Sequence, residues 1–341
     1  MVQDKIKEIA ELSFKANITK DEDEKEKIEQ NVQAILKDLK KSALDTFKDE
    51  SDIKRFLDNI VNFNNYSFNN LCLIWMQNHD ARYVASYRTY LKMGYHVNKD
   101  ETGIKILVPS FFKLVKIKIS DNEFEVKPLK SLNDEEMKIY RDKNDDRITF
   151  YKDYLSRFNV GTVFDVSQTN MPMNVIDEKL NPILDDPRAD SVADIFIKSI
   201  YRDGFKVKYE NIEGGAKGYC NFDDSTIVVK NNLSNLMRLK VIVHEYAHAL
   251  AHKHLKDNNM EYQQHREKYE TEAEAIAYVV SKYLGLDTSN YSQTYLYSWS
   301  KNKDFKEIDD SFSTIVNYSR KIINNYNKIV EKELNVNSVS I

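Results

Sequence analysis

The chain has 341 residues, 30% of them charged and 41% hydrophobic, and its net charge at pH 7 is −4. This length allows two domains of ordinary size, and the charge excludes a globally basic nucleic-acid-binding protein, so any such site must be local. Met1 is followed by charged residues without an apolar segment, and no apolar run approaches the length of a membrane span. Cys72 and Cys220 lie far apart and are expected to be reduced thiols in the cytosol. We therefore expect a soluble, cytoplasmic protein without a membrane partner.

The amino-terminal residues 1–51 form a highly charged lead. Apolar residues within it recur at helical spacing, at Ile28, Val32, Ile35 and Leu39. This spacing predicts two helices that are separated near residues 17–20. Further helix is expected over residues 56–78, with an interruption at the asparagine-rich residues 62–65.

Short strands are expected after this helical region. Residues 104–108 are rich in Ile, Leu and Val, and residues 114–119 alternate lysines with Val and Ile, which is the period of a strand. Residues 131–147 are dominated by charge, and residues 131–157 are expected to be a linker that is partly helical. The pattern therefore predicts a first, small α/β domain at residues 52–130.

A second folded unit is expected over residues 158–335, followed by a tail at residues 336–341. Its predicted elements are strands at 161–166 and 226–229, a helix at 194–201 and a long helix at 305–334. Together with the first domain, these elements predict an α+β fold that is mainly helical.

Residues 63–105 combine aromatic side chains with asparagine and basic residues. Proteins that bind single-stranded nucleic acid stack the bases on aromatic rings and place basic side chains along the backbone. Large aromatic residues are, however, more often buried in a core, so that alternative stays open. The candidate DNA-binding residues are Asn69, Trp75, Tyr87, Arg88, Lys92 and Lys99.

The most informative motif is the segment 244–248, which reads H-E-x-x-H inside an apolar run. Because residues four apart share one face of a helix, His244 and His248 can point at a single ion. Zinc prefers such nitrogen ligands, and catalytic zinc keeps one position open for water. Glu245 then has the place of the general base of a metallopeptidase. The alternative is a buried helix that carries two histidines by chance, which this spacing makes less plausible.

A catalytic zinc needs a third protein ligand, and His254 is one candidate. It lies six residues after His248, as in H-E-x-x-H-x-x-G-x-x-H enzymes, but Ala251 stands where those enzymes have the glycine that turns the chain. We expect the helix to continue past Ala251, which would carry His254 away from the ion. His252, His254 and His265 are therefore expected at the surface.

Glu270 is the second candidate and is favoured here. It lies on an acidic helix expected over residues 269–278, and a carboxylate from a second helix completes a site of two histidines and one glutamate. Glu274, one turn later, is expected to orient a histidine of the site. The alternative for both glutamates is a solvated helix face.

Several of these segments together resemble ArdC-type antirestriction proteins and their LtrC-like plasmid relatives. In the amino-terminal half, the resemblance rests on Ser67, Asn69, Leu71, Gly94, Val97, Lys99, Gly103, Ile104, Ile106 and Pro109. In the second half, it rests on residues 163–169, the H-E-x-x-H motif, Glu270, Ala273, Glu274, Tyr295, Leu296 and Trp299. It covers most of residues 52–320, and the second half is also similar to the ImmA/IrrE metallopeptidase group.

The resemblance implies a single-stranded-DNA-binding domain joined to a zincin-like metallopeptidase domain, in which the H-E-x-x-H helix packs on a small sheet. It implies zinc as the cofactor, single-stranded DNA as a partner and antirestriction, or counteraction of mobile-element defence, as the function. One alternative is an antirestriction factor that binds DNA or a nuclease without proteolysis and keeps a structural metal. Another is a regulatory peptidase that cleaves a repressor. In the peptidase case, we expect strand 226–229 to hold the substrate peptide by edge pairing.

Overall fold

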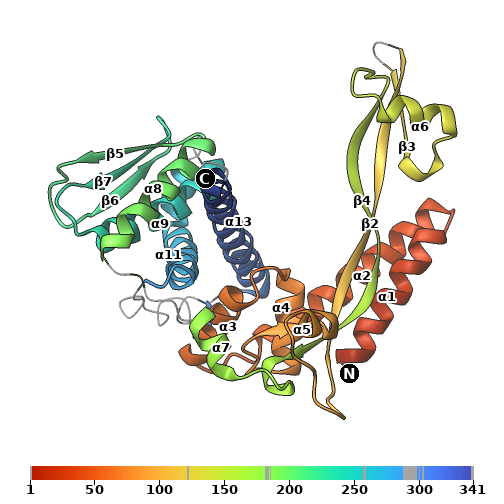
Figure 1. The fold of residues 1–341 in the computed structure, drawn as a ribbon, viewed down its shortest axis with the longest axis horizontal. Coiled ribbons are helices and arrows are strands. Elements are labelled where there is room, and N and C mark those ends of the chain that lie inside the picture. The colour runs from red at the N-terminus through yellow and green to blue at the C-terminus, as the bar shows by residue number, and fades with distance from the viewer. Residues whose placement is uncertain are drawn as a thin grey trace. The chain divides into compact units, whose positions relative to one another are not determined.

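The computed structural model describes residues 2–120, 123–180, 184, 186–255, 259–286, 298, 300–301 and 303–338. The chain forms two compact units, Met1–Leu39 with Ile104–Val163 and Lys40–Gly103 with Phe164–Ile341. The fold is α+β and mainly helical, with two small sheets, as the sequence predicts (Figure 1). Of the described helices, none combines the length and hydropathy that a membrane span requires.

In the first unit, two helices accompany a long antiparallel sheet. The helices are α1 (Val2–Ile18) and α2 (Glu22–Leu44), so the predicted break near residues 17–20 is confirmed. Helix α1 buries Ile6 and Ile9 and packs against strand β2. The remaining elements are β2 (Ile104–Ser120), β3 (Glu123–Pro128), η1 (Leu129–Ser131), α6 (Asp134–Arg141) and β4 (Ile148–Asp165).

Strand β2 is one continuous strand, whereas the sequence analysis expects two short ones. It pairs with β4 from Ile104 to Ile117 and with β3 from Leu114 to Ser120. Proline lacks the N–H that a ladder needs. The strand nevertheless passes through Pro109, and the register shifts directly afterwards, between Ser110 and Phe111, and again between Leu114 and Val115. The β-bulges thus take up the irregularity without ending the strand.

The expectation of a linker at residues 131–157 is wrong for much of this segment. It contains α6, whose capping box joins Asn133 and Glu136, and the beginning of β4, which pairs with β2. Most side chains of β4 before residue 161 are half-exposed or exposed. Such a strand lacks the alternation of buried and exposed residues by which a half-buried strand is predicted from a sequence.

The second unit begins with helices α3 (Glu50–Asn62) and α4 (Phe68–Gln77), which confirms the predicted interruption at residues 62–65. An aromatic cluster forms around Trp75, whose ring contacts Phe47 and Phe56 at centroid distances of 5.5 and 5.8 Å. Phe56 also contacts Phe312 of α13, 5.6 Å away. Short elements follow: β1 (Val84–Ala85), α5 (Tyr87–Lys92), η2 (Val166–Gln168) and α7 (Met173–Leu180).

A three-stranded sheet and four longer helices complete this unit. Its strands are β5 (Lys206–Glu210), β6 (Gly218–Asn221) and β7 (Thr226–Lys230), in the order β5-β7-β6. The four longer helices are α8 (Asp186–Arg202), α9 (Asn235–Ala251), α11 (Arg266–Tyr283) and α13 (Phe305–Ser338). Two short helices, η3 (Lys253–Leu255) and α10 (Asn259–Gln264), lie between α9 and α11 in the chain. Helix α9 packs on β6 and β7 and against α8 and α11 (Figure 1). The predicted strand at 226–229 and the helices at 194–201 and 305–334 are confirmed.

Candidate metal centre

Helix α9 presents His244 and His248 on one face. Ser234 caps the helix by accepting a hydrogen bond from the N–H of Met237, and apolar residues such as Ile242 and Val243 are fully buried. The two imidazole rings lie 4.9 Å apart between centroids. The buried apolar residues set the orientation of the helix, and His244 and His248 then lie side by side on one of its faces.

Helix α11 brings Glu270 to these histidines. Its Oε2 atom lies 3.4 Å from His248 Nε2 and 3.9 Å from His244 Nε2. One ligand atom from each of the three residues falls within 4.8 Å of the others. Two imidazole nitrogens and one carboxylate oxygen are the donor set of catalytic zinc in several hydrolases, so these residues fit a divalent ion. Glu274 Oε2 lies 3.3 Å from His244 Nδ1.

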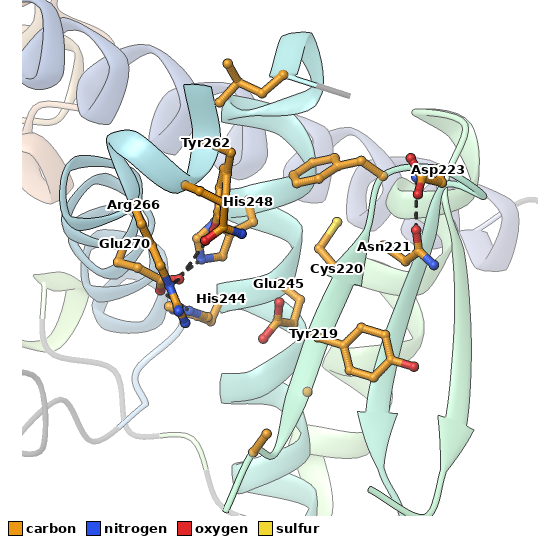
Figure 2. A pocket seen from close by; sticks show the side chains of 15 residues that line it. Tyr219, Cys220, Asn221, Asp223, His244, Glu245, His248, Tyr262, Arg266 and Glu270 are labelled. Atoms are coloured by element: carbon orange, nitrogen blue, oxygen red, sulfur yellow. Dashed lines mark hydrogen bonds and ion pairs between the residues drawn. The ribbon is translucent and has the colours of Figure 1, made fainter. Parts of the chain in front are cut away.

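Glu245 lies beside this group, on the side that faces strand β6 (Figure 2). Its side chain is buried, and the backbone N–H of Cys220 donates to its carboxylate. Burial raises the pKa of Glu245 to about 7, with His244 acting in the opposite direction. A carboxyl group with this pKa is suited to exchange a proton near neutral pH.

The surrounding charges set the protonation of the other three groups. Burial lowers the pKa of His248 to about 4, so this histidine is neutral at neutral pH. The hydrogen bond with His248 lowers the pKa of Glu270 to about 2, despite partial burial. Burial also opposes a proton on His244, but the hydrogen bond with Glu274 and the neighbouring carboxylates outweigh it and raise the pKa. Neutral His248 and charged Glu270 are in the forms that bind metals.

The site opens into a cavity of about 790 Å³. Strand β6 forms one wall, and Tyr262 and Arg266 line it beside Glu270 (Figure 2). Strand β7 lies between β5 and β6, so the expectation that residues 226–229 pair with a substrate at a sheet edge is wrong. The edge strand beside the site is β6, because its only ladder partner among the described strands is β7.

The end of helix α9 corrects two expectations. The α-helix stops at Ala251 and tightens into η3, although neither glycine nor proline ends it. His254 and His265 are exposed, as expected, but His252 is completely buried. The sequence did carry a signal for the burial of His252. It follows His248 by four residues and therefore lies on the same face of the helix as the two histidines of the site.

The candidate DNA-binding residues differ in their exposure to solvent. Trp75 is completely buried, and its indole N–H donates to Thr46, so it is not available for stacking on a base. Asn69 is half-buried. Tyr87, Arg88, Lys92 and Lys99 are exposed, the first three on α5.

Exposed aromatic residues that sequence reasoning missed lie on β2 and β4. Phe111, Phe150 and Tyr151 are each about half exposed. Strand β2 also carries four lysines and no acidic residue. The alternation of lysines with apolar residues at 114–119 was the one available signal for this surface.

Comparisons with known proteins match both halves of the chain. Residues 22–160 match the family model of the N-terminal domain of anti-restriction factor ArdC, and residues 202–308 match that of a peptidase IrrE N-terminal-like domain. An uncharacterized protein of Bacillus anthracis is 25% identical over 325 residues, which are 90% of this chain and 53% of the relative. The chain thus spans about half the length of this curated relative.

Two solved structures of the antirestriction protein ArdC from the R388 plasmid also resemble the chain. The metal-free structure is 18% identical, with a TM-score of 0.40, over 77% of this chain and 86% of ArdC. The Mn(II)-bound structure is 17% identical, with a TM-score of 0.41, over 77% of this chain and 84% of ArdC. Tyr295, Leu296 and Trp299, which contribute to the motif resemblance, lie outside the described residues. By its two family matches, the chain has the ArdC-type architecture, an ArdC amino-terminal domain followed by an IrrE-like domain.

Proposed function

We propose that the chain is a zinc-dependent peptidase coupled to single-stranded DNA binding, and that it acts in antirestriction. The observation that carries the enzymatic part is the convergence of His244, His248 and Glu270 with Glu245 beside them. The peptidase family match over residues 202–308 supports it.

The reaction assigned to this site is hydrolysis of a peptide bond. A bound zinc ion would supply a Lewis acid that polarises the substrate carbonyl and acidifies water. Glu245 takes the proton from the attacking water and passes it to the leaving amine. Burial in the cavity raises the pKa of Glu245 and so makes its carboxylate a stronger base toward the attacking water. His244, His248 and Glu270 hold the ion, and Glu274 orients His244 through Nδ1.

The substrate peptide is placed along strand β6. Residues Gly218–Asn221 line the cavity beside Glu245, and the free edge of β6 can pair with an extended chain. Main-chain pairing at this edge would present the scissile carbonyl toward the two histidines. This replaces the pairing with residues 226–229 expected from the sequence.

Single-stranded DNA is placed on exposed aromatic and basic side chains. We call the exposed parts of β2, β3 and β4, residues 108–120, 123–128 and 148–160, the ribbon. Its lysines stand close to aromatic rings, with Lys116 Nζ 3.8 Å from the ring centroid of Phe124 and Lys152 Nζ 5.3 Å from that of Tyr151. Rings and cations on one surface are what a single strand requires. Tyr87, Arg88, Lys92 and Lys99 form a second candidate surface.

One experiment separates this proposal from a binding factor with a structural metal. Wild-type protein and Glu245→Gln are compared for zinc content and for protection of an incoming plasmid against restriction. We expect about one zinc per chain in both proteins and loss of protection in the variant only. Protection by Glu245→Gln equal to that of the wild type would assign the function to binding without proteolysis, and absence of metal from the wild type would remove the enzymatic part altogether.

A further inference from the structure

A cavity of about 310 Å³ lies in the first unit, between the turn that joins α1 to α2 and the strands of the ribbon. Helices α1 and α2 run beside β2 and β4 (Figure 1). The volume is at the lower end of the range of small-molecule sites, about 300–1,000 Å³. The residues of the metal centre and the candidate DNA-binding residues do not line this cavity.

Two aromatic side chains of the ribbon form part of the cavity wall. Phe112 of β2 and Tyr154 of β4 are directly opposite in the ladder, and their ring centroids are 5.1 Å apart. Both residues are half-buried, whereas the neighbouring Phe111 is 57% exposed and does not line the cavity. An aromatic ring offers a stacking surface to any base. The cavity thus contains a surface on which an unpaired base can pack.

Two lysines lie close to these rings. Lys25 of α2 lines the cavity, and Lys130 Nζ lies 5.6 Å from the ring centroid of Phe112. Lys25 is also 3.4 Å from Glu22, whose side chain is 82% exposed. Because an ion pair that is open to water is weak, Lys25 can exchange Glu22 for a phosphate group. The lysines therefore suit the backbone of a nucleotide whose base packs on the rings.

Glu29 gives the cavity a means of choosing among bases. It lies one turn after Lys25 on α2, lines the cavity and is exposed. A carboxylate accepts hydrogen bonds and cannot donate them. It suits the exocyclic amino group of a base such as cytosine, and it disfavours the carbonyl group that uracil and thymine carry at the same position. Asn17 and Ser156 also line the cavity and can bond to the remaining polar atoms of the base.

We propose that this cavity is a subsite for one nucleotide of single-stranded DNA, in which the base packs on Phe112 and Tyr154 and its exocyclic amino group donates to Glu29. The proposal rests on the single-stranded DNA binding of the proposed function and adds a preference among bases to it. It also gives the charged residues 1–51 a part in recognition, because α1, α2 and the turn between them supply the wall opposite the strands.

The preference is measured by fluorescence anisotropy of the full-length protein with short oligodeoxycytidylate and oligodeoxyuridylate of equal length. These bases have the same size and differ by an amino group in place of a carbonyl group. We expect the wild type to bind the cytidylate roughly 10-fold more tightly. The difference should disappear in Glu29→Ala and persist in Glu26→Ala, an exposed position on α2 outside the cavity. Equal affinities of the wild type for the two oligomers, or a preference that survives in Glu29→Ala, would overturn the proposal.

Stacking is tested by comparing Tyr154→Ala with Phe150→Ala. Both variants remove a ring from β4, but Phe150 does not line the cavity. We expect Phe150→Ala to weaken the binding of both oligomers equally and to keep the preference. Tyr154→Ala should lose roughly 10-fold in affinity for the cytidylate and lose the preference, whereas Tyr154→Phe keeps the ring and should keep both. An unchanged preference in a folded Tyr154→Ala protein would contradict the subsite, and if that variant does not fold, Glu29→Ala decides.

Photo-cross-linking shows where the base lies. An oligomer that contains one 5-iododeoxycytidine is irradiated with the full-length protein, and the cross-linked peptide is identified by mass spectrometry. We expect a cross-link at Phe112 or Tyr154, and its loss with an excess of unmodified oligodeoxycytidylate. Cross-links found only outside the cavity would overturn the proposal.

These outcomes distinguish the subsite from the proposed function. A wild type that binds neither oligomer removes the DNA binding and the subsite together. Binding of both oligomers without a preference and without a cross-link in the cavity removes the subsite alone and leaves DNA binding on the exposed side chains.

Discussion

The carboxyl group of Glu245 is buried, so its ionisation is unfavourable in the metal-free protein. Its pKa is raised from 4.5 to about 7, so the folded chain holds the proton more tightly than the unfolded chain. Its contribution to stability is therefore fully present below pH 4.5 and is lost as the pH rises through 7. We expect metal-free Glu245→Gln to be more stable than the wild type at pH 8, by up to about 3 kcal/mol, and nearly equal to it at pH 5.

Urea unfolding of both metal-free proteins at the two pH values measures this difference in free energy. Glu331→Gln, at an exposed position, is the control and should show no pH-dependent difference. A variant less stable than the wild type at pH 8 would show that the charged carboxylate is well compensated in the fold.

The two candidates for the third ligand differ in burial and in distance. Glu270 lies within reach of both histidines, whereas His254 is exposed and lies outside the group of possible ligands. We expect Glu270→Ala to weaken zinc binding by at least about 100-fold and His254→Ala to leave it within a factor of two, because a lost ligand costs more than a lost outer partner. Zinc titration of both variants measures this. A larger loss from His254→Ala would mean that the chain after Ala251 folds back to the ion.

At the residue scale, the sequence predicts the centre of the site better than its surroundings. The spacing of His244 and His248 follows from helix geometry, and the structure brings them together with Glu270. Glu270 was preferred to His254 because the helix was expected to continue past Ala251, and that premise is wrong although His254 does lie outside the group. The burial of His252 had a local signal, its place four residues after His248, but the burial of Trp75 had none. A tryptophan is buried or exposed according to the element that packs over it, and no local pattern names that element.

At the scale of elements, the contact between β6 and α9 holds Glu245 in place. A Cβ on Gly218 would lie 2.5 Å from Cγ1 of Val241, 2.9 Å from the carbonyl oxygen of Val228 and 3.2 Å from Cγ of Glu245. We expect Gly218→Ala to push β6 away from α9, to lower stability by about 1–3 kcal/mol and to reduce peptidase activity more than zinc affinity. Gly215→Ala, which meets nothing within 4 Å, is the matched control.

Thermal unfolding, zinc titration and hydrolysis are compared for the two glycine variants. Equal activities of Gly218→Ala and Gly215→Ala would show that the position of Glu245 does not depend on this close approach.

The elements themselves were predictable where at least one face is buried. Helices α9 and α11 have apolar residues at helical spacing, and the central strand β7 is a short run of Thr, Ile and Val. The end of strand β4 matches the strand predicted at 161–166, but its first part was not predictable, because it has exposed side chains on both faces. The end of α9 at Ala251 was missed for a different reason, since helix propensity favours continuation and only the packing of η3 opposes it.

For the whole molecule, the order of elements along the chain decides which fragments can fold. The sequence-based domain at residues 52–130 contains β2 but lacks β4, its partner from Ile104 to Ile117. Removing β4 would leave the backbone groups of β2 along that edge without their ladder. The family match to the ArdC domain runs over residues 22–160 and includes both strands. DNA binding is therefore best measured on the full chain.

We expect the full chain to bind an oligothymidylate more tightly than duplex DNA, with an affinity that falls as salt rises, because lysines release counterions from the phosphates. Stacking on one aromatic ring contributes about 1–3 kcal/mol, so Phe150→Ala on the ribbon should weaken binding by roughly 10-fold, and Lys113→Glu should also reduce the salt dependence. Fluorescence anisotropy at several salt concentrations measures both effects. Tyr201→Ala and Lys332→Glu make the same changes at exposed positions on α8 and α13 and should leave binding unchanged.

The same measurement on Tyr87→Ala and Arg88→Glu distinguishes the ribbon from α5. Tyr87 is 49% exposed and Phe150 is 50% exposed, so the two rings are equally open to a base and differ only in their surroundings. Strand β2 supplies Lys113, Lys116 and Lys118 to the ribbon, whereas α5 supplies Arg88 and Lys92. If electrostatic attraction decides where the DNA binds, the ribbon variants must lose more DNA affinity than the α5 variants at low salt. At high salt, the affinities of the two sets of variants must become similar. Loss of binding in the α5 variants alone would show that DNA binds at α5 and not on the ribbon.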